Sequence, residues 1–219
     1  MTLKLVIGNK NYSSWSMRPW LALRANGIAF EEIFVPLYTG VAADKERLLS
    51  FSASGKVPAL IDGDVTVWDS LAIIEYVAER FPEARLWPDD RAERAHARAI
   101  SAEMHSGFVA LRSECGMNLH RPIRAVTLSP DAQANVARIE QIWTGCRKRY
   151  GEGGPFLFGS FGAADAMFAP VVHRFRTFAI PVGPTAQAYM ETMMALPAFA
   201  EWTVAGLAET LVIDRFEAV

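Results

Sequence analysis

Two hydrophobic periodicities divide the chain. Up to residue 82, short apolar runs typical of buried strands alternate with segments of helical periodicity. Strands are predicted over 3–8 and 30–37, and a hairpin over 57–68 turns at "DGD". Helices are predicted after each of the first two strands, and another over 69–81 follows the hairpin. The order β-α-β-α-β-β-α predicts a small α/β domain.

Further along the chain the strand signals disappear and helical periodicity continues to the end. Ser129 precedes Pro130 as an N-cap precedes a first-turn proline. We therefore expect an α+β fold with two domains, an α/β domain over 1–82 and an all-α domain over 91–219, joined by a linker at 83–90. The predicted helices of the second domain cover about 90–116, 130–150, 163–178, 185–195 and 198–209.

The composition is that of an ordinary globular protein, with 219 residues of which 51% are hydrophobic and 21% charged. A formal net charge of −2 favours neither nucleic acid nor an anionic membrane as a partner. No apolar run reaches the length of a membrane span, and the first residues lack a secretory signal pattern. Cys115 and Cys146 have no metal-like spacing, and the four histidines form no i, i+4 pair. We expect a cytoplasmic protein without a metal.

Hydroxyl groups cluster before the first predicted helix, in "NYSSWSMRPW". Pro19 belongs in a first turn because it lacks an N–H, which predicts a helix start near Ser16 or Met17. Ser13 and Ser14 would then lie at the positive end of the helix, where a hydroxyl can donate a hydrogen bond to a thiolate. The local pattern alone favours ordinary capping of a turn.

Two further motifs stand beside predicted strands. If the Val57-Pro58 bond is cis, the backbone N–H and C=O of Val57 turn outward and can pair with an extended peptide ligand; an ordinary trans proline is the alternative. Asp69 and Ser70 begin the helix after the hairpin, where they could bind the ammonium and carboxylate groups of a ligand. Simple N-capping is the alternative there.

The joint order of these motifs is more specific than any one of them. "SSWSMR", "GKVPAL" and "WDSLAIIEYVAERFP", followed by an all-helical remainder, resemble the cytosolic glutathione transferase superfamily along essentially the whole chain. The likeness is strongest to zeta-like and related bacterial members, whose start reads S-S-C-S-x-R. The resemblance implies a thioredoxin-like amino-terminal domain, a helical carboxyl-terminal domain, a homodimer and glutathione as co-substrate.

The resemblance also implies roles for single residues. Ser13 takes the place of the catalytic serine, with Ser14 as the immediate alternative because the serine is doubled. Trp15 stands where the zeta signature has the cysteine of maleylacetoacetate isomerases, and neither Arg174 nor Arg176 matches the register of their substrate arginine. Both departures argue against isomerase activity, which is the alternative to conjugation of a small electrophile.

For glutathione itself, the resemblance implies contacts on three motifs. The backbone of Val57, next to a cis Pro58, would pair with the cysteinyl part. Lys56 would meet the glycyl carboxylate. Asp69 and Ser70 would hold the γ-glutamyl end.

The second substrate is expected in an apolar pocket between the domains. The proposed lining is Trp15, Tyr38, Met104, His105 and Phe108, although the helical spacing of Met104 and Phe108 is also typical of a core. The expected function is glutathione transfer to largely apolar electrophiles. A non-catalytic glutathione-fold binding module is a further alternative, and a thiol-disulfide enzyme would need a cysteine at the serine positions.

One motif of the helical domain concerns folding. "GSFGAADAMF" resembles the family's capping box before a buried helix, with Asp165 as its acidic residue. Gly162 stands where the usual cap is Ser or Thr, which we interpret as a tolerated replacement.

Overall fold

The computed structural model describes residues 2–217 and confirms the two-part α+β architecture. A four-stranded sheet with strand order β2-β1-β3-β4 forms the amino-terminal part. β1 pairs in parallel with β2 and antiparallel with β3, and β3 and β4 form the predicted hairpin. The strands are β1 (Leu3–Ile7), β2 (Phe30–Phe34), β3 (Ala59–Asp62) and β4 (Val65–Trp68).

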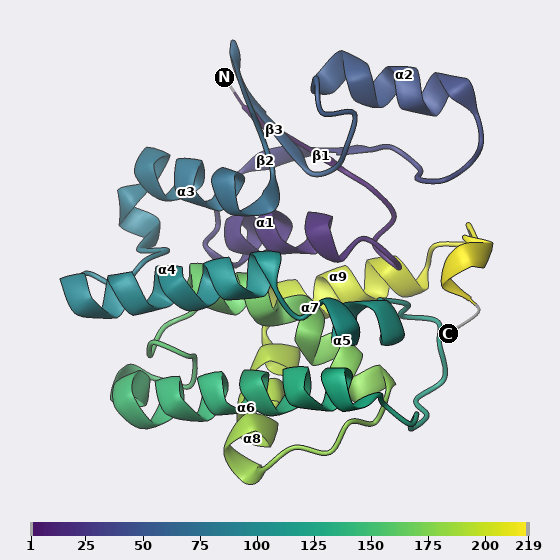
Figure 1. Ribbon diagram of the computed structural model, residues 1–219. Coiled ribbons are helices and arrows are strands. Elements are labelled where there is room, and N and C mark those ends of the chain that lie inside the picture. Colours follow the sequence, from purple (N-terminus) through teal and green to yellow (C-terminus); the bar gives the residue numbers. More distant parts are fainter. Residues whose placement is uncertain (1, 218–219) are drawn as a thin grey trace.

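Helices cover both faces of this sheet. Leu5 and Ile7 of β1 belong to the main core, which the sheet shares with α1 and α3. Val6, which points to the opposite face, packs with Val35 and with Leu48 of α2. Figure 1 shows α1 and α3 between the sheet and the helices of the carboxyl-terminal part, with α2 on the other side of the sheet. The three helices are α1 (Ser14–Ala25), α2 (Ala42–Phe51) and α3 (Ser70–Arg80).

The rest of the chain is helical and packs around α7, nearly all of whose residues are buried. α7 lies against α1 and α4 and so joins the two parts of the molecule. Short 3₁₀ turns lie at Pro82–Ala84, Gly151–Gly153 and Asp214–Phe216. The α-helices are α4 (Arg91–Ser106), α5 (Val109–Glu114), α6 (Pro130–Tyr150), α7 (Ala163–Thr177), α8 (Pro184–Ala195) and α9 (Pro197–Leu207).

One predicted helix, over 90–116, is wrong as a single element. The chain leaves the helix at Gly107, which is extended, and Phe108 takes a positive φ of 58° before α5 begins. A Cβ at Gly107 would lie 2.7 Å from the Glu103 carbonyl oxygen, so only glycine allows this close turn.

The predicted start of α1 is also wrong. The helix begins at Ser14, with Ser13 as N-cap, and Pro19 lies inside the helix. The Ser16 N–H donates to Ser13 Oγ at 3.3 Å, which stabilises the earlier start. The proline merely deprives the Trp15 carbonyl of its helical donor, a smaller effect than the prediction assumed.

Two kinds of feature are missing from the described residues. Within residues 2–217, no helix is long and apolar enough to cross a membrane. The same part of the chain holds no group of three or more His, Cys, Asp or Glu side chains arranged for a metal ion. Both cysteines are free and buried.

Candidate functional site

A cleft of about 970 Å³ lies beside the amino-terminal end of α1. Its walls come from the β1–α1 loop, the segment after β2, α2, the residues before β3, α5, α7 and the carboxyl-terminal turn. Six of the residues predicted for the site line it: Ser13, Ser14, Trp15, Tyr38, Lys56 and Val57.

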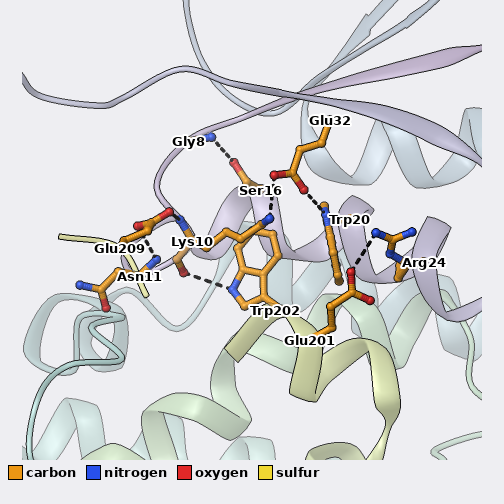
Figure 2. A network of polar contacts seen from close by, with 10 residues as sticks. All are labelled: Gly8, Lys10, Asn11, Ser16, Trp20, Arg24, Glu32, Glu201, Trp202 and Glu209. Atoms are coloured by element: carbon orange, nitrogen blue, oxygen red, sulfur yellow. Dashed lines mark hydrogen bonds and ion pairs between the residues drawn. The ribbon is translucent and has the colours of Figure 1, made fainter. Parts of the chain in front are cut away.

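The loop that leads into α1 is held by the helical part of the molecule. The Glu209 carboxylate accepts hydrogen bonds from the backbone N–H of Lys10 at 2.6 Å and of Asn11 at 3.1 Å. The Trp202 indole donates to the Lys10 carbonyl at 3.1 Å (Figure 2). These contacts fix the position of the following serines relative to the helical domain.

Ser13 has a role inside the helix start. Its hydroxyl donates to Ser16 Oγ at 2.8 Å and accepts the capping bond from the Ser16 N–H. Ser16 Oγ also accepts from the Gly8 N–H at 3.1 Å, which connects the cap to the end of β1. The proton of Ser13 is therefore already donated within the protein.

Ser14 has a different environment, although it is equally buried. Its Oγ accepts a hydrogen bond from Arg174 Nη2 at 3.3 Å. No residue within 2–217 accepts the Ser14 hydroxyl proton. The neighbouring Trp15 N–H, in the first helical turn, likewise has no acceptor in that part of the chain. Two hydrogen-bond donors are thus available at the start of α1.

Three arginines surround this helix start without a carboxylate partner in the described chain. Arg174 Nε donates to the Cys115 carbonyl at 2.8 Å, and Arg18 Nε donates to the Met167 carbonyl at 3.2 Å. Both side chains are buried and keep an unpaired Nη1. Burial and the charge of Arg112 lower the pKa of Arg174 to about 10. Burial and the charges of Arg174 and Arg112 likewise lower the pKa of Arg18, and the charge of Asp69 opposes this shift in part. Arg112 and Arg174 of this cluster line the cleft and give its wall a positive charge.

Trp15 lines the cleft and is in contact with two arginines and a histidine. The guanidinium groups of Arg18 and Arg112 lie over its ring, 4.3 Å and 4.5 Å from the centroid. His105 packs against the same indole in a T-shaped arrangement, with 5.2 Å between the ring centroids. Cation–π contacts with one arginine of α1 and one of α5 therefore hold the indole at the wall of the cleft.

The residues before β3 offer an open stretch of backbone. The Val57-Pro58 bond is cis. Neither the N–H nor the C=O of Val57 has a hydrogen-bond partner within residues 2–217, and Lys56 beside it is exposed. An extended ligand in the cleft can therefore pair with Val57 in the manner of a β-strand.

Asp69 and Ser70 lie at the start of α3 and outside the lining of the cleft. The Asp69 carboxylate accepts from the Leu71 N–H at 2.9 Å, which confirms its predicted capping role, and lies 3.2 Å from His105 Nε2. The Ser70 hydroxyl is fully buried and unpaired. Their predicted contact with the γ-glutamyl group remains a prediction.

Three of the residues predicted for the second-substrate pocket lie elsewhere than expected. Met104 and Phe108 lie in the main hydrophobic core and do not line the cleft. His105 faces Trp15 and Asp69 behind the cleft wall. The break after Ser106 is the physical reason, because it turns Phe108 inward and brings α5 to the cleft in place of α4.

The carboxyl-terminal turn closes one side of the cleft. Phe216 contacts the rings of Tyr12 and Tyr38, each at 5.6 Å between centroids, and the Arg215 guanidinium lies 4.4 Å from the Tyr38 centroid. The Glu217 carboxylate accepts hydrogen bonds from the Tyr12 hydroxyl and from Asn118. Tyr38 therefore belongs to the wall that this turn covers.

Several lining residues were not predicted from the sequence. Arg174 carries the clearest signal, a charged residue within an apolar helix, whereas Arg112, Arg215 and Phe216 carry none. Their place in the cleft depends on how α5 and the chain end fold over α1, and no local pattern encodes that arrangement.

Comparison with known proteins identifies the family of this chain. The family model described as the glutathione S-transferase N-terminal domain matches residues 12–80, and the C-terminal domain model matches residues 129–205. Glutathione S-transferase Z1 of Arabidopsis thaliana is 30% identical over 205 residues, which cover 87% of this chain and 89% of that protein. The chain belongs to the glutathione transferase superfamily. Maleylacetoacetate isomerase of Rattus norvegicus is 30% identical over 195 residues, covering 85% and 86% of the two chains. This places the transferase-like protein on the branch of the zeta class and maleylacetoacetate isomerase.

Solved structures of the superfamily share the fold. A Burkholderia glutathione transferase homolog with bound glutathione superposes with a TM-score of 0.68 at 24% identity, over 95% of this chain and 100% of that one. Ure2p in complex with glutathione superposes with a TM-score of 0.69 at 18% identity, over 93% of each chain. The likeness confirms the thioredoxin-like domain followed by an all-helical domain in this glutathione transferase-like chain.

Proposed function

We propose that this protein binds glutathione in the cleft and transfers its thiolate to a small electrophilic carbon. The observation that carries the proposal is that the unpaired backbone of Val57 and the unpaired donors at the start of α1 face the same cleft. A peptide paired with Val57 would bring its sulfur toward the α1 donors. Glutathione complexes of structural relatives support the choice of ligand.

We assign the hydrogen bond to the sulfur to Ser14. The resemblance implied Ser13, but that hydroxyl donates to Ser16 and caps α1. Ser14 keeps its proton available, and the Trp15 N–H lies beside it. Both donors, together with the positive end of α1, favour the thiolate over the thiol.

The chemistry requires one bond exchange. The thiol proton leaves to solvent, and the thiolate electron pair forms a carbon–sulfur bond with the electrophile. A leaving group departs with its own electron pair, or an activated double bond takes up a proton from water. The protein lowers the pKa of the thiol and orients the sulfur.

Kinetics of single variants test the assignment. Ser14→Ala is expected to reduce kcat/KM with a neutral aryl halide by on the order of 10². Ser13→Ala should reduce it less than about tenfold, because that residue acts on helix stability. The reverse order would return the role to Ser13. Wild-type rates in both variants would rule out a serine mechanism, and glutathione binding without turnover would indicate a binding module.

A second candidate is the isomerisation of a carboxylate-bearing substrate. Arg112 lines the cleft without a carboxylate partner in the described chain, and the rat relative is named for such a reaction. In it the thiolate would add to a cis double bond, allow rotation and leave again, which regenerates glutathione. Arg112→Gln should then raise KM for a cis-enedioate substrate about tenfold or more and leave KM for a neutral aryl halide unchanged. Equal effects on both substrates would argue against this candidate.

A further inference from the structure

The hydrogen bond from Arg174 excludes one direction for the hydroxyl proton of Ser14. Arg174 carries only donors, so at 3.3 Å the Ser14 oxygen must accept and its proton must point elsewhere. The guanidinium is itself fixed, because Nε donates to the Cys115 carbonyl at 2.8 Å. The contact therefore works as a directional constraint on a hydroxyl that could otherwise rotate.

The charge of Arg174 is poorly compensated where it lies. The side chain is 4% exposed, and its Nη1 has no hydrogen-bond partner. The groups that act on it electrostatically are the cation Arg112 and the thiol of Cys115, while Arg18, a second cation, is affected by Arg174 in turn. Burial raises the pKa of Cys115 to about 11, so this thiol is neutral near pH 7. His173, the next residue on α7, is neutral there as well, because burial lowers its pKa to about 3. A negative charge entering the cleft relieves repulsion among the three arginines.

We propose that Arg174 is a positioning residue for thiol transfer: it turns the Ser14 proton toward the bound sulfur and stabilises the thiolate electrostatically. The inference rests on the proposed function, since it needs glutathione in the cleft. The thiol site would then consist of residues from both domains, because Arg174 belongs to the helical domain.

The matched experiment compares two arginines of α7. Arg174→Met removes the hydrogen bond and the charge, whereas Arg176→Gln removes an exposed charge two residues further on. The readouts are the ultraviolet absorbance of the bound thiolate against pH and the pH dependence of kcat/KM with a neutral aryl halide. Unfolding in urea checks that each variant is folded.

In Arg174→Met we expect the apparent pKa of the bound thiol to rise by about one unit, which is about tenfold less thiolate near neutral pH. The rate should recover at alkaline pH, and KM for glutathione should change little. Arg176→Gln should titrate like the wild type. Adding Arg174→Met to Ser14→Ala should cause little further loss, because the arginine acts largely through that hydroxyl.

Other outcomes overturn the inference or the proposed function separately. A rate loss that is equal at every pH, with an unchanged thiol pKa, would mean that Arg174 is merely structural. If Arg174→Met does not fold, Arg174→Gln keeps an N–H donor without the charge and carries the same test: an unshifted thiol titration overturns the inference. If the wild type shows no thiolate absorbance with glutathione, the proposed function fails before any variant is compared.

Discussion

The amino-terminal ends of α1 and α7 both carry a buried polar side chain, but they differ in whether its hydrogen bonds are completed within the protein. The two helices pack against each other in the middle of the molecule. At α7, the Asp165 carboxylate accepts hydrogen bonds from the N–H of Gly162 at 2.9 Å, from the N–H of Leu157 at 3.1 Å and from the Tyr189 hydroxyl at 3.1 Å. At α1, the Ser14 hydroxyl proton has no acceptor in the described chain, and a cation lies beside it.

The difference lies in whether the set of partners is complete. Around Asp165 every donor is paired inside the protein, so the arrangement stabilises the fold and leaves nothing for a ligand. Around Ser14 the donors and positive charges exceed the acceptors, so an anionic ligand completes the set. Whether a polar residue at a helix start stabilises the fold or can bind a ligand therefore depends on how many of its donors and acceptors are already paired within the protein.

The largest effect is expected at the start of α7, where the hydrogen bonds of Asp165 are completed within the protein. Asp165→Ala leaves two backbone amides and the Tyr189 hydroxyl without their acceptor, so we expect the free energy of unfolding to fall by about 3 to 5 kcal/mol. Asp131→Ala, an exposed first-turn acid on α6, should change it by less than about 0.5 kcal/mol. Urea denaturation measures both. A loss below about 1 kcal/mol for Asp165→Ala would mean that the three hydrogen bonds do not hold α7.

The second prediction concerns pH. Burial raises the pKa of Asp165 to about 6, so between about pH 4 and pH 6 the folded protein binds this proton more tightly than the unfolded chain does. The carboxyl group therefore makes the fold less stable as pH rises through that window, by about 3 kcal/mol in total. Asp165→Asn lacks the effect, so the difference in unfolding free energy between wild type and variant should change by about 2 kcal/mol from pH 4 to pH 7. Parallel pH profiles would contradict the raised pKa.

A smaller effect is expected at the cap of α7. A Cβ at Gly162 would lie 2.8 Å from the Leu86 carbonyl oxygen, which also accepts the Ala163 N–H. Gly162→Ser should therefore lower the free energy of unfolding by about 2 kcal/mol, although serine is the better cap in general. The glycine is required by close packing and is more than a tolerated replacement. Increased stability in urea denaturation would show that Leu86 moves aside freely.

The smallest effect is expected at the cap of α1. Ser13→Gly should cost only a few tenths of a kcal/mol, and Ser13→Ala about 1 kcal/mol, as at other N-caps. Thermal or urea unfolding of the two variants separates these values. A loss above about 2 kcal/mol for the glycine variant would mean that Ser13 supports more of the β1–α1 loop than the cap alone.

Local signals predicted much of this molecule. Pro130 and Tyr150 bound α6 as predicted, and Asp69 caps α3, because caps, prolines and periodicity act over a few residues. The start of α1 was mispredicted because capping by Ser13 allows the helix to begin before the first turn that Pro19 was expected to occupy. The break at Gly107 was missed because the periodicity continues across it.

The sequence predicted only some of the residues that line the cleft. The serines and Val57 follow one another in recognisable motifs and do line the cleft. Arg112 and Arg174 come from α5 and α7 and meet α1 only after both parts have packed together. The contacts of these arginines with α1 depend on how the domains pack, and the spacing of residues in the sequence does not predict them.

The stacking of Trp15 has a practical optical consequence. Its indole lies at the cleft wall under two guanidinium groups, and the emission of an indole depends on the electric field at its ring. A ligand that adds negative charge to the cleft changes this field whether or not a reaction follows. The difference in fluorescence between the wild type and Trp15→Phe therefore reports occupancy directly, so that ligands can be screened without knowing the electrophile.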